Sequence, residues 1–80
     1  MNKDETKQAI QDVLTDGLFL KEDTVFDWTT TFEALGLDSL DKIECKMTIE
    51  DGLSVTLPED SFAGDVLTVE DAVNLVMEHA

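Results

Sequence analysis

The chain has 80 residues and a formal net charge of −14, from 19 acidic residues against five lysines and no arginine. This balance excludes nucleic acid as a partner and disfavours anionic membrane surfaces, because both require a basic footprint on the protein. Hydrophobic residues make up 42% of the chain, enough to build a core, so we expect residues 1–80 to form one small domain.

Several kinds of site and location are disfavoured by simple absences in the sequence. No apolar run approaches the roughly 20 residues of a membrane span, and the polar start "MNKDETKQ" does not resemble a signal peptide. Cys45 is the only cysteine and His79 the only histidine, so we expect neither an internal disulfide nor a metal site. We therefore expect a soluble, cytoplasmic monomer whose acidic surface favours basic protein partners. The alternative explanation of the acidity is solubility alone.

The first predicted helix runs from about Asp4 to Asp16. Ile10, Val13 and Leu14 recur at helical spacing, and Gly17 is a suitable stop. A long connection, Leu18 to Gly36, follows. Its many apolar side chains indicate that it packs across the core.

The second predicted helix begins after Asp38, which can cap it together with Asp41 in a capping-box arrangement. It is expected to end near Asp51, with Gly52 as the stop.

Two more helical segments follow. Pro58 suits the first position of a short helix that ends near Phe62. Thr68 can cap a last helix that carries Val69, Ala72, Val73 and Val76 on one face. We therefore predict an all-α fold, a small four-helix bundle of three main helices and one short helix.

The second helix carries apolar residues on two sides, with Leu40, Ile43 and Met47 on one and Cys45 and Ile49 roughly opposite. Periodicity alone favours burial of the tighter stripe, Leu40–Ile43–Met47. Alternatively, this stripe with its nearby carboxylates could face a basic partner that has an apolar pocket.

Ser39 falls at the first position of this helix, so its hydroxyl should be exposed beside the unpaired backbone N–H groups of the first turn. No base is near it in the sequence, which disfavours a catalytic nucleophile. The free N–H groups and the helix dipole would instead favour a covalently held phosphate.

The stretch "LGLDSLDKIE", Leu35–Glu44, resembles the attachment motif of acyl carrier proteins. The resemblance extends through "DSLDKIECKMTIEDGLSVTLP" and "LTVEDAVNLV" and so covers essentially the whole chain. It implies a carrier and not an enzyme. Such a carrier would hold acyl intermediates as thioesters on a 4′-phosphopantetheine arm and present them to enzymes of fatty acid or related biosynthesis.

The resemblance also implies roles for individual residues. Ser39 would carry the arm, and Asp38 would be recognised by the phosphopantetheinyl transferase that loads it. Acyl-loading, condensing and other biosynthetic enzymes with basic surfaces would bind a partner surface, which is formed by Leu40, Asp41, Ile43, Glu44 and Met47. This favours the exposed interpretation of the apolar stripe over burial.

Two departures from the family pattern are Lys46, at a position that is commonly apolar, and the additional Lys42. They leave open a carrier for polyketide or aminoacyl units in a specialised pathway. A third alternative is an acidic protein-binding domain of the same fold that is never modified.

Overall fold

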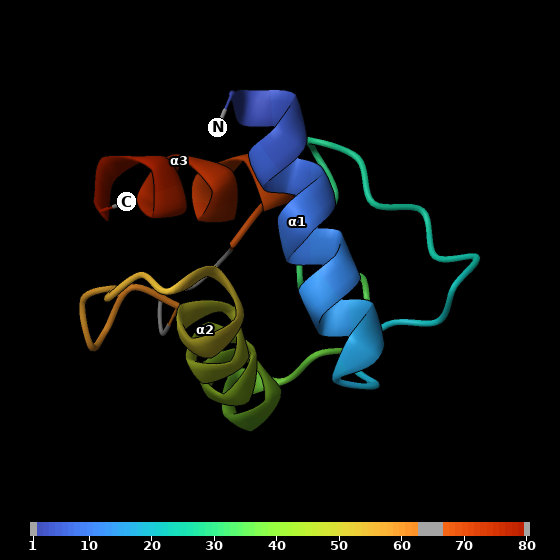
Figure 1. Ribbon diagram of the computed structural model, residues 1–80. Helices are drawn as coiled ribbons and strands as arrows, with labels where there is room; N and C mark the ends of the chain where they lie inside the picture. Colours follow the sequence, from blue (N-terminus) through green and yellow to red (C-terminus); the bar gives the residue numbers. More distant parts are fainter. Residues whose placement is uncertain (1, 63–66, 80) are drawn as a thin grey trace.

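Three helices, α1 (Lys3–Asp16), α2 (Ser39–Leu53) and α3 (Val69–His79), form the fold in the computed structural model, which describes residues 2–62 and 67–79 (Figure 1). Helix α1 packs against both of the others, whereas α2 and α3 stay further apart. The all-α prediction is confirmed. Within the described residues, no helix is both long enough and apolar enough to cross a membrane.

Helix α1 begins one residue earlier than expected because Asn2 caps it. The Asn2 side chain accepts a hydrogen bond from the Glu5 N–H at 2.8 Å, and the Glu5 carboxylate accepts from the Asn2 N–H. The helix ends as predicted at Gly17, whose N–H donates to the Val13 carbonyl. The left-handed residue that turns the chain away is Leu18, with φ 68°.

The end of α2 differs from the prediction. Gly52 does not stop the helix, which continues to Leu53 and is capped by Ser54 in the left-handed conformation. Instead, Gly52 lets α1 approach closely, since a Cβ atom at this position would lie 2.7 Å from the Val13 Cγ2 atom. Glycine is needed here for lack of space and not for its freedom of φ.

The long connection between α1 and α2 packs across the core, as expected (Figure 1, cyan to green). Leu20, Phe26 and Phe32 are buried, and the Phe32 ring meets the Phe62 ring edge to face with centroids 5.6 Å apart. The connection is also tied to the start of α3, because the Phe32 N–H donates to the Leu67 carbonyl at 2.8 Å. The segment that leads into α2 is thus fixed both by its packing against Phe62 and by its hydrogen bond to Leu67.

The expected short helix at 58–62 is instead a turn, in which the Ser61 N–H donates to the Pro58 carbonyl. Within the described residues the fold therefore has the three main helices and not the predicted fourth, short one. Thr68 caps α3 as predicted, through reciprocal hydrogen bonds with Asp71. The predicted apolar face of α3, Val69, Ala72, Val73 and Val76, is buried.

Candidate functional site

Ser39 is the first residue of α2, and its side chain is exposed. The turn before it sets this position. Gly36 adopts φ 84°, and the buried Leu37 donates its N–H to the Phe32 carbonyl at 3.2 Å. Leu37 therefore anchors the chain in the core immediately before the helix, and Ser39 is presented to solvent two residues later.

The two aspartates around Ser39 form a complete capping box, as predicted. The Asp41 N–H donates to Asp38 Oδ1 at 2.9 Å, and the Asp38 N–H donates to Asp41 Oδ2 at 3.3 Å. Both carboxylates are thereby engaged with the backbone, and neither is positioned as a base for the serine.

The surroundings of Ser39 suit a residue that is modified by another protein. No hydrogen bond joins its hydroxyl to any residue that the structure describes. The N–H groups of Ser39 and Leu40 belong to the first turn and have no intrahelical acceptor. A phosphodiester on the Ser39 oxygen would lie at the positive end of the helix dipole. The residues present therefore fit a covalently held phosphate group.

The stripe Leu40–Ile43–Met47 lies on the surface, with exposed fractions of 64%, 42% and 53%. The periodicity-based expectation that it is buried is wrong, and the alternative of an exposed stripe is confirmed. Cys45 and Ile49 are the fully buried apolar residues of α2. The buried face was hidden in the sequence because Lys42 and Lys46 complete it.

Lys42 and Lys46 are only 4% and 8% exposed, although lysine is rarely buried without a partner. Lys42 donates to Glu33, which precedes α2. The other carboxylate oxygen of Glu33 accepts from the Leu67 N–H at 3.4 Å. The hydrogen bond from Lys42 holds the pKa of Glu33 below its usual value. This ion pair links α2 to the segments on either side of it.

A second ion pair lies one turn further along α2. The Lys46 ammonium donates to Glu50 Oε1 at 3.2 Å, and the Leu57 N–H donates to Glu50 Oε2 at 2.8 Å. The Leu57 N–H and then Lys46 lower the pKa of Glu50. Sequence reasoning missed both pairs. For the pair of Lys46 with Glu50, the available signal was their four-residue spacing.

The two carboxylates expected at the partner surface, Asp41 and Glu44, lie on α2 near the apolar stripe. Glu44 is exposed beside the apolar stripe, and Asp41 is half-buried in the first turn. The structure thus brings together all five residues, Leu40, Asp41, Ile43, Glu44 and Met47, on one side of α2.

Cys45 is buried, and burial raises the pKa of its thiol to about 12, with a further contribution from Asp41 and Glu44. A thiol that remains protonated is a poor nucleophile. Cys45 is therefore a small packing residue.

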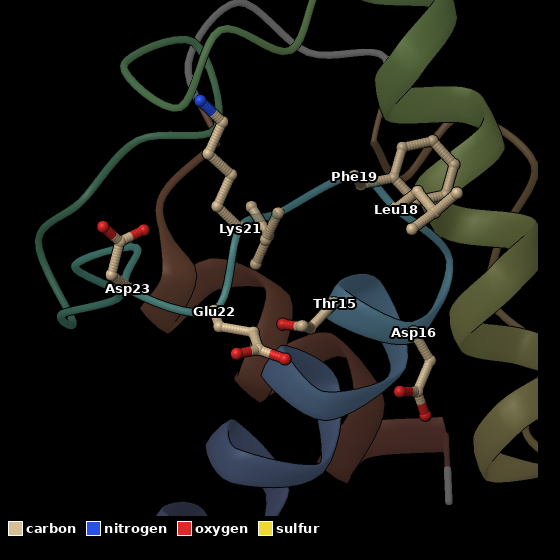
Figure 2. A pocket seen from close by; sticks show the side chains of 8 residues that line it. Thr15, Asp16, Leu18, Phe19, Lys21, Glu22 and Asp23 are labelled. Carbon is tan, nitrogen blue, oxygen red and sulfur yellow. The ribbon is translucent and has the colours of Figure 1, made fainter.

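An open hollow lies where α1 passes into the connection. Figure 2 shows Thr15 and Asp16 at the end of α1 and the charged side chains of Lys21, Glu22 and Asp23 around it. None of its lining residues belongs to α2, so it is separate from the Ser39 region. Within residues 2–62 and 67–79, no three His, Cys, Asp or Glu side chains form a group that could hold a metal ion.

Comparison with known proteins gives one family match and several similar chains. A family model described as a phosphopantetheine attachment site matches residues 7–76. The acyl carrier protein of Rubrobacter xylanophilus is 35% identical over 79 residues, which cover 99% of this chain and 96% of that protein. The acyl carrier protein of Zymomonas mobilis is 35% identical over 75 residues, 94% of this chain and 95% of that protein.

Acyl carrier protein 2, chloroplastic, of Hordeum vulgare is 39% identical over 74 residues, 92% of this chain. The matched region is 57% of the barley protein, so this chain spans little more than half the length of that relative.

Proposed function

The chain belongs to the acyl carrier protein family of phosphopantetheine-binding carriers, and from this premise we propose that Ser39 is the residue that holds the arm. The resemblance noted in "LGLDSLDKIE" is thus confirmed at the level of the family. The protein is a carrier and not an enzyme, and its cofactor is 4′-phosphopantetheine.

The observation that carries the assignment to Ser39 is its exposed hydroxyl at the first position of α2, within the matched residues 7–76. The chain has two other serines. Ser54 ends α2 in the left-handed conformation, and the Ser61 hydroxyl donates to the Pro58 carbonyl. Neither has the free N–H groups of a helix start beside it. These differences support Ser39 as the attachment site.

Loading requires an external transferase, because Ser39 has no base of its own. The Ser39 oxygen would take the phosphopantetheinyl group from coenzyme A and lose its proton, with adenosine 3′,5′-bisphosphate as the leaving group. The thiol at the end of the arm supplies the thioester that holds the acyl group. Asp38 would contribute by fixing the start of α2 and by recognition through its charge.

The partner surface of Leu40, Asp41, Ile43, Glu44 and Met47 is proposed to meet the basic surfaces of acyl-loading, condensing and other biosynthetic enzymes. Its support is an exposed apolar stripe with Glu44 beside it, on the helix that begins at Ser39. Charge-steered encounters speed association with each enzyme in turn. We assign the carrier to fatty acid or related biosynthesis, and residues 1–80 to one carrier domain. One shared core beneath the three helices supports the single domain.

Intact mass spectrometry tests the attachment site. The protein, Ser39→Ala and Ser54→Ala would each be incubated with coenzyme A, magnesium and a broad-specificity phosphopantetheinyl transferase. We expect a gain of one phosphopantetheine in the parent and in Ser54→Ala, and none in Ser39→Ala. Ser54→Ala is the matched control because it removes an exposed serine from the other end of the same helix.

Loading of Ser39→Ala would refute the site. Absence of loading in all three proteins, with apo starting material verified and several transferases tried, would favour an unmodified acidic binding domain.

A further inference from the structure

The path along α2 from Ser39 leads over charged side chains. At about 100° per residue, Lys46 and Glu50 fall almost directly below Ser39 on the helix surface. Lys42 lies to their buried side and Ile43 to their exposed side. An arm that folds back from Ser39 along α2 therefore reaches the boundary between the core and the apolar stripe.

We call this boundary the seam. It is the line along which α2 meets the segments around Glu33, Leu57 and Leu67. Two ion pairs lie along it: Lys42 reaches across the seam to Glu33, whereas Lys46 and Glu50 both belong to α2. Each carboxylate also accepts a backbone N–H: Glu50 of α2 accepts from Leu57 across the seam, and Glu33 accepts from Leu67 on its own side. The seam is thus joined by charge-assisted hydrogen bonds at two successive turns of the helix.

An aliphatic chain that entered the core through the seam would have to separate Lys42 from Glu33 and the Leu57 N–H from Glu50. The Lys42 side chain is buried, and moving its ammonium group away from the Glu33 carboxylate is unfavourable. The Leu57 N–H would also lose its acceptor, the Glu50 carboxylate. Burial of a few methylene groups offers no compensating hydrogen bonds.

We propose that Lys42 and Lys46 are specificity-determining residues that keep the acyl chain outside the fold, so that this carrier serves short acyl groups. The inference rests on the proposed function, because it concerns cargo on the Ser39 arm. It adds a substrate class that the family membership does not give.

The test compares acetyl and dodecanoyl cargo on the parent and on the double variant Lys42→Met/Lys46→Met. Each arm would be loaded from the corresponding acyl-coenzyme A by the transferase. Hydroxylamine then cleaves the thioester to a hydroxamate and the free thiol, and its rate reports how accessible the thioester is. Methionine matches the lysine stem in shape and removes the charge.

In the parent we expect the same cleavage rate for both chain lengths. In the double variant we expect the dodecanoyl thioester to be cleaved about tenfold more slowly, because entry of the chain draws its thioester toward the core. Lys21→Met, which removes the charge of an exposed lysine in the connection, should behave as the parent.

Slow cleavage of dodecanoyl cargo on the parent would overturn the proposal, and this result does not depend on the variant. Equal rates for both cargoes on a double variant that retains its helical circular dichroism would overturn the assignment to Lys42 and Lys46. If the double variant does not fold, Lys46→Met alone takes its place.

A tether that needs no transferase separates this inference from the proposed function. Ser39→Cys would be alkylated with N-methylmaleimide or N-dodecylmaleimide, while the buried Cys45 stays unreacted. The dodecyl group should leave the thermal midpoint unchanged in Ser39→Cys and raise it when Lys42→Met/Lys46→Met is added. A rise already present in Ser39→Cys would overturn the closed seam, whereas failure of enzymatic loading overturns only the proposed function.

Discussion

Asp38 has two roles: its carboxylate caps α2, and the transferase is proposed to recognise its charge. The cap is a hydrogen bond of 2.9 Å from the Asp41 N–H. Asparagine caps helices as well as aspartate does, whereas alanine cannot accept the hydrogen bond. Two substitutions at one position therefore separate the structural role from recognition.

We expect Asp38→Ala to lower the free energy of unfolding by about 1 kcal/mol and to slow loading. Asp38→Asn should keep the stability within about 0.5 kcal/mol of the parent and still load more slowly, because it retains the cap and loses the charge. Denaturant unfolding and the loading rate measured by mass provide the two readouts. Loading of Asp38→Asn at the parental rate would show that the transferase does not read the charge.

The region around Asp38 contains features that could be predicted from the sequence and one that could not. The capping box, the exposed Ser39 and the stop at Gly17 follow from local backbone rules, and each was predicted from a few adjacent residues. The ion pair of Lys42 with Glu33 joins residues nine positions apart across a turn. Its formation depends on how the connection folds, and no local rule specifies that.

At the scale of the helix, Gly52 of α2 also shows that local sequence rules do not predict contacts between distant segments. Glycine near the end of a helical pattern indicates a C-terminal stop, and that prediction was wrong. The position is set by the approach of α1, where Val13 leaves no room for a Cβ atom. A contact between helices so far apart in sequence has no local signature. Periodicity alone misassigned the exposed stripe for a related reason, since lysines completed the buried face.

Gly52→Ala tests this contact. Alanine is favoured over glycine in a helix interior by about 1 kcal/mol, but its Cβ atom would lie 2.7 Å from a Val13 methyl group. Valine is stiff at χ1 and cannot move aside easily. We expect a net loss of about 1–2 kcal/mol of stability, measured by denaturant unfolding.

Val13→Ala provides the matched control, because it removes the methyl groups that the new Cβ atom would meet. In the Val13→Ala background, Gly52→Ala should become neutral or stabilising, as the helix propensity then acts alone. Equal effects of Gly52→Ala in both backgrounds would contradict the steric explanation.

The partner surface of α2 allows a test of charge steering. Reversal of Glu44 by Glu44→Lys should slow association with a basic partner enzyme by about tenfold at low salt, because steering depends on the charge that the partner meets. The effect should shrink as ionic strength rises, since exposed charges are screened. Stopped-flow association rates across a salt series would measure it.

Glu78→Lys on the exposed end of α3 is the control for total charge. If Glu78→Lys slows association as much as Glu44→Lys does, the net charge of the molecule guides the encounter. The face of α2 would then have no special role.

For the whole molecule, the charge of −14 and the two ion pairs of the seam respond to acid in opposite ways. Protonation of the many exposed carboxylates relieves their mutual repulsion and so favours the folded state. Protonation of Glu33 and Glu50 removes the negative charges that strengthen their hydrogen bonds to Lys42 and to the Leu57 N–H. A pH profile of the parent alone therefore mixes the two effects, and the contribution of an ion pair requires a difference between proteins.

The difference between the parent and Glu33→Gln isolates the pair of Glu33 with Lys42. The fold lowers the pKa of Glu33 below its ordinary 4.5, mainly through the hydrogen bond from Lys42. The stability that this carboxylate contributes is therefore fully present above pH 4.5 and is lost as the pH falls through the lower, folded-state pKa. Glu33→Gln should be less stable than the parent at pH 7, and the two free energies of unfolding should converge in acid.

Glu78→Gln is the control, because it removes the same charge from an exposed position outside both ion pairs. Its difference in stability from the parent should not show this convergence in acid. A difference for Glu33→Gln that stayed constant from neutral pH into acid would mean that the carboxylate is not stabilised by its charge, and the seam would then be held by packing and neutral hydrogen bonds.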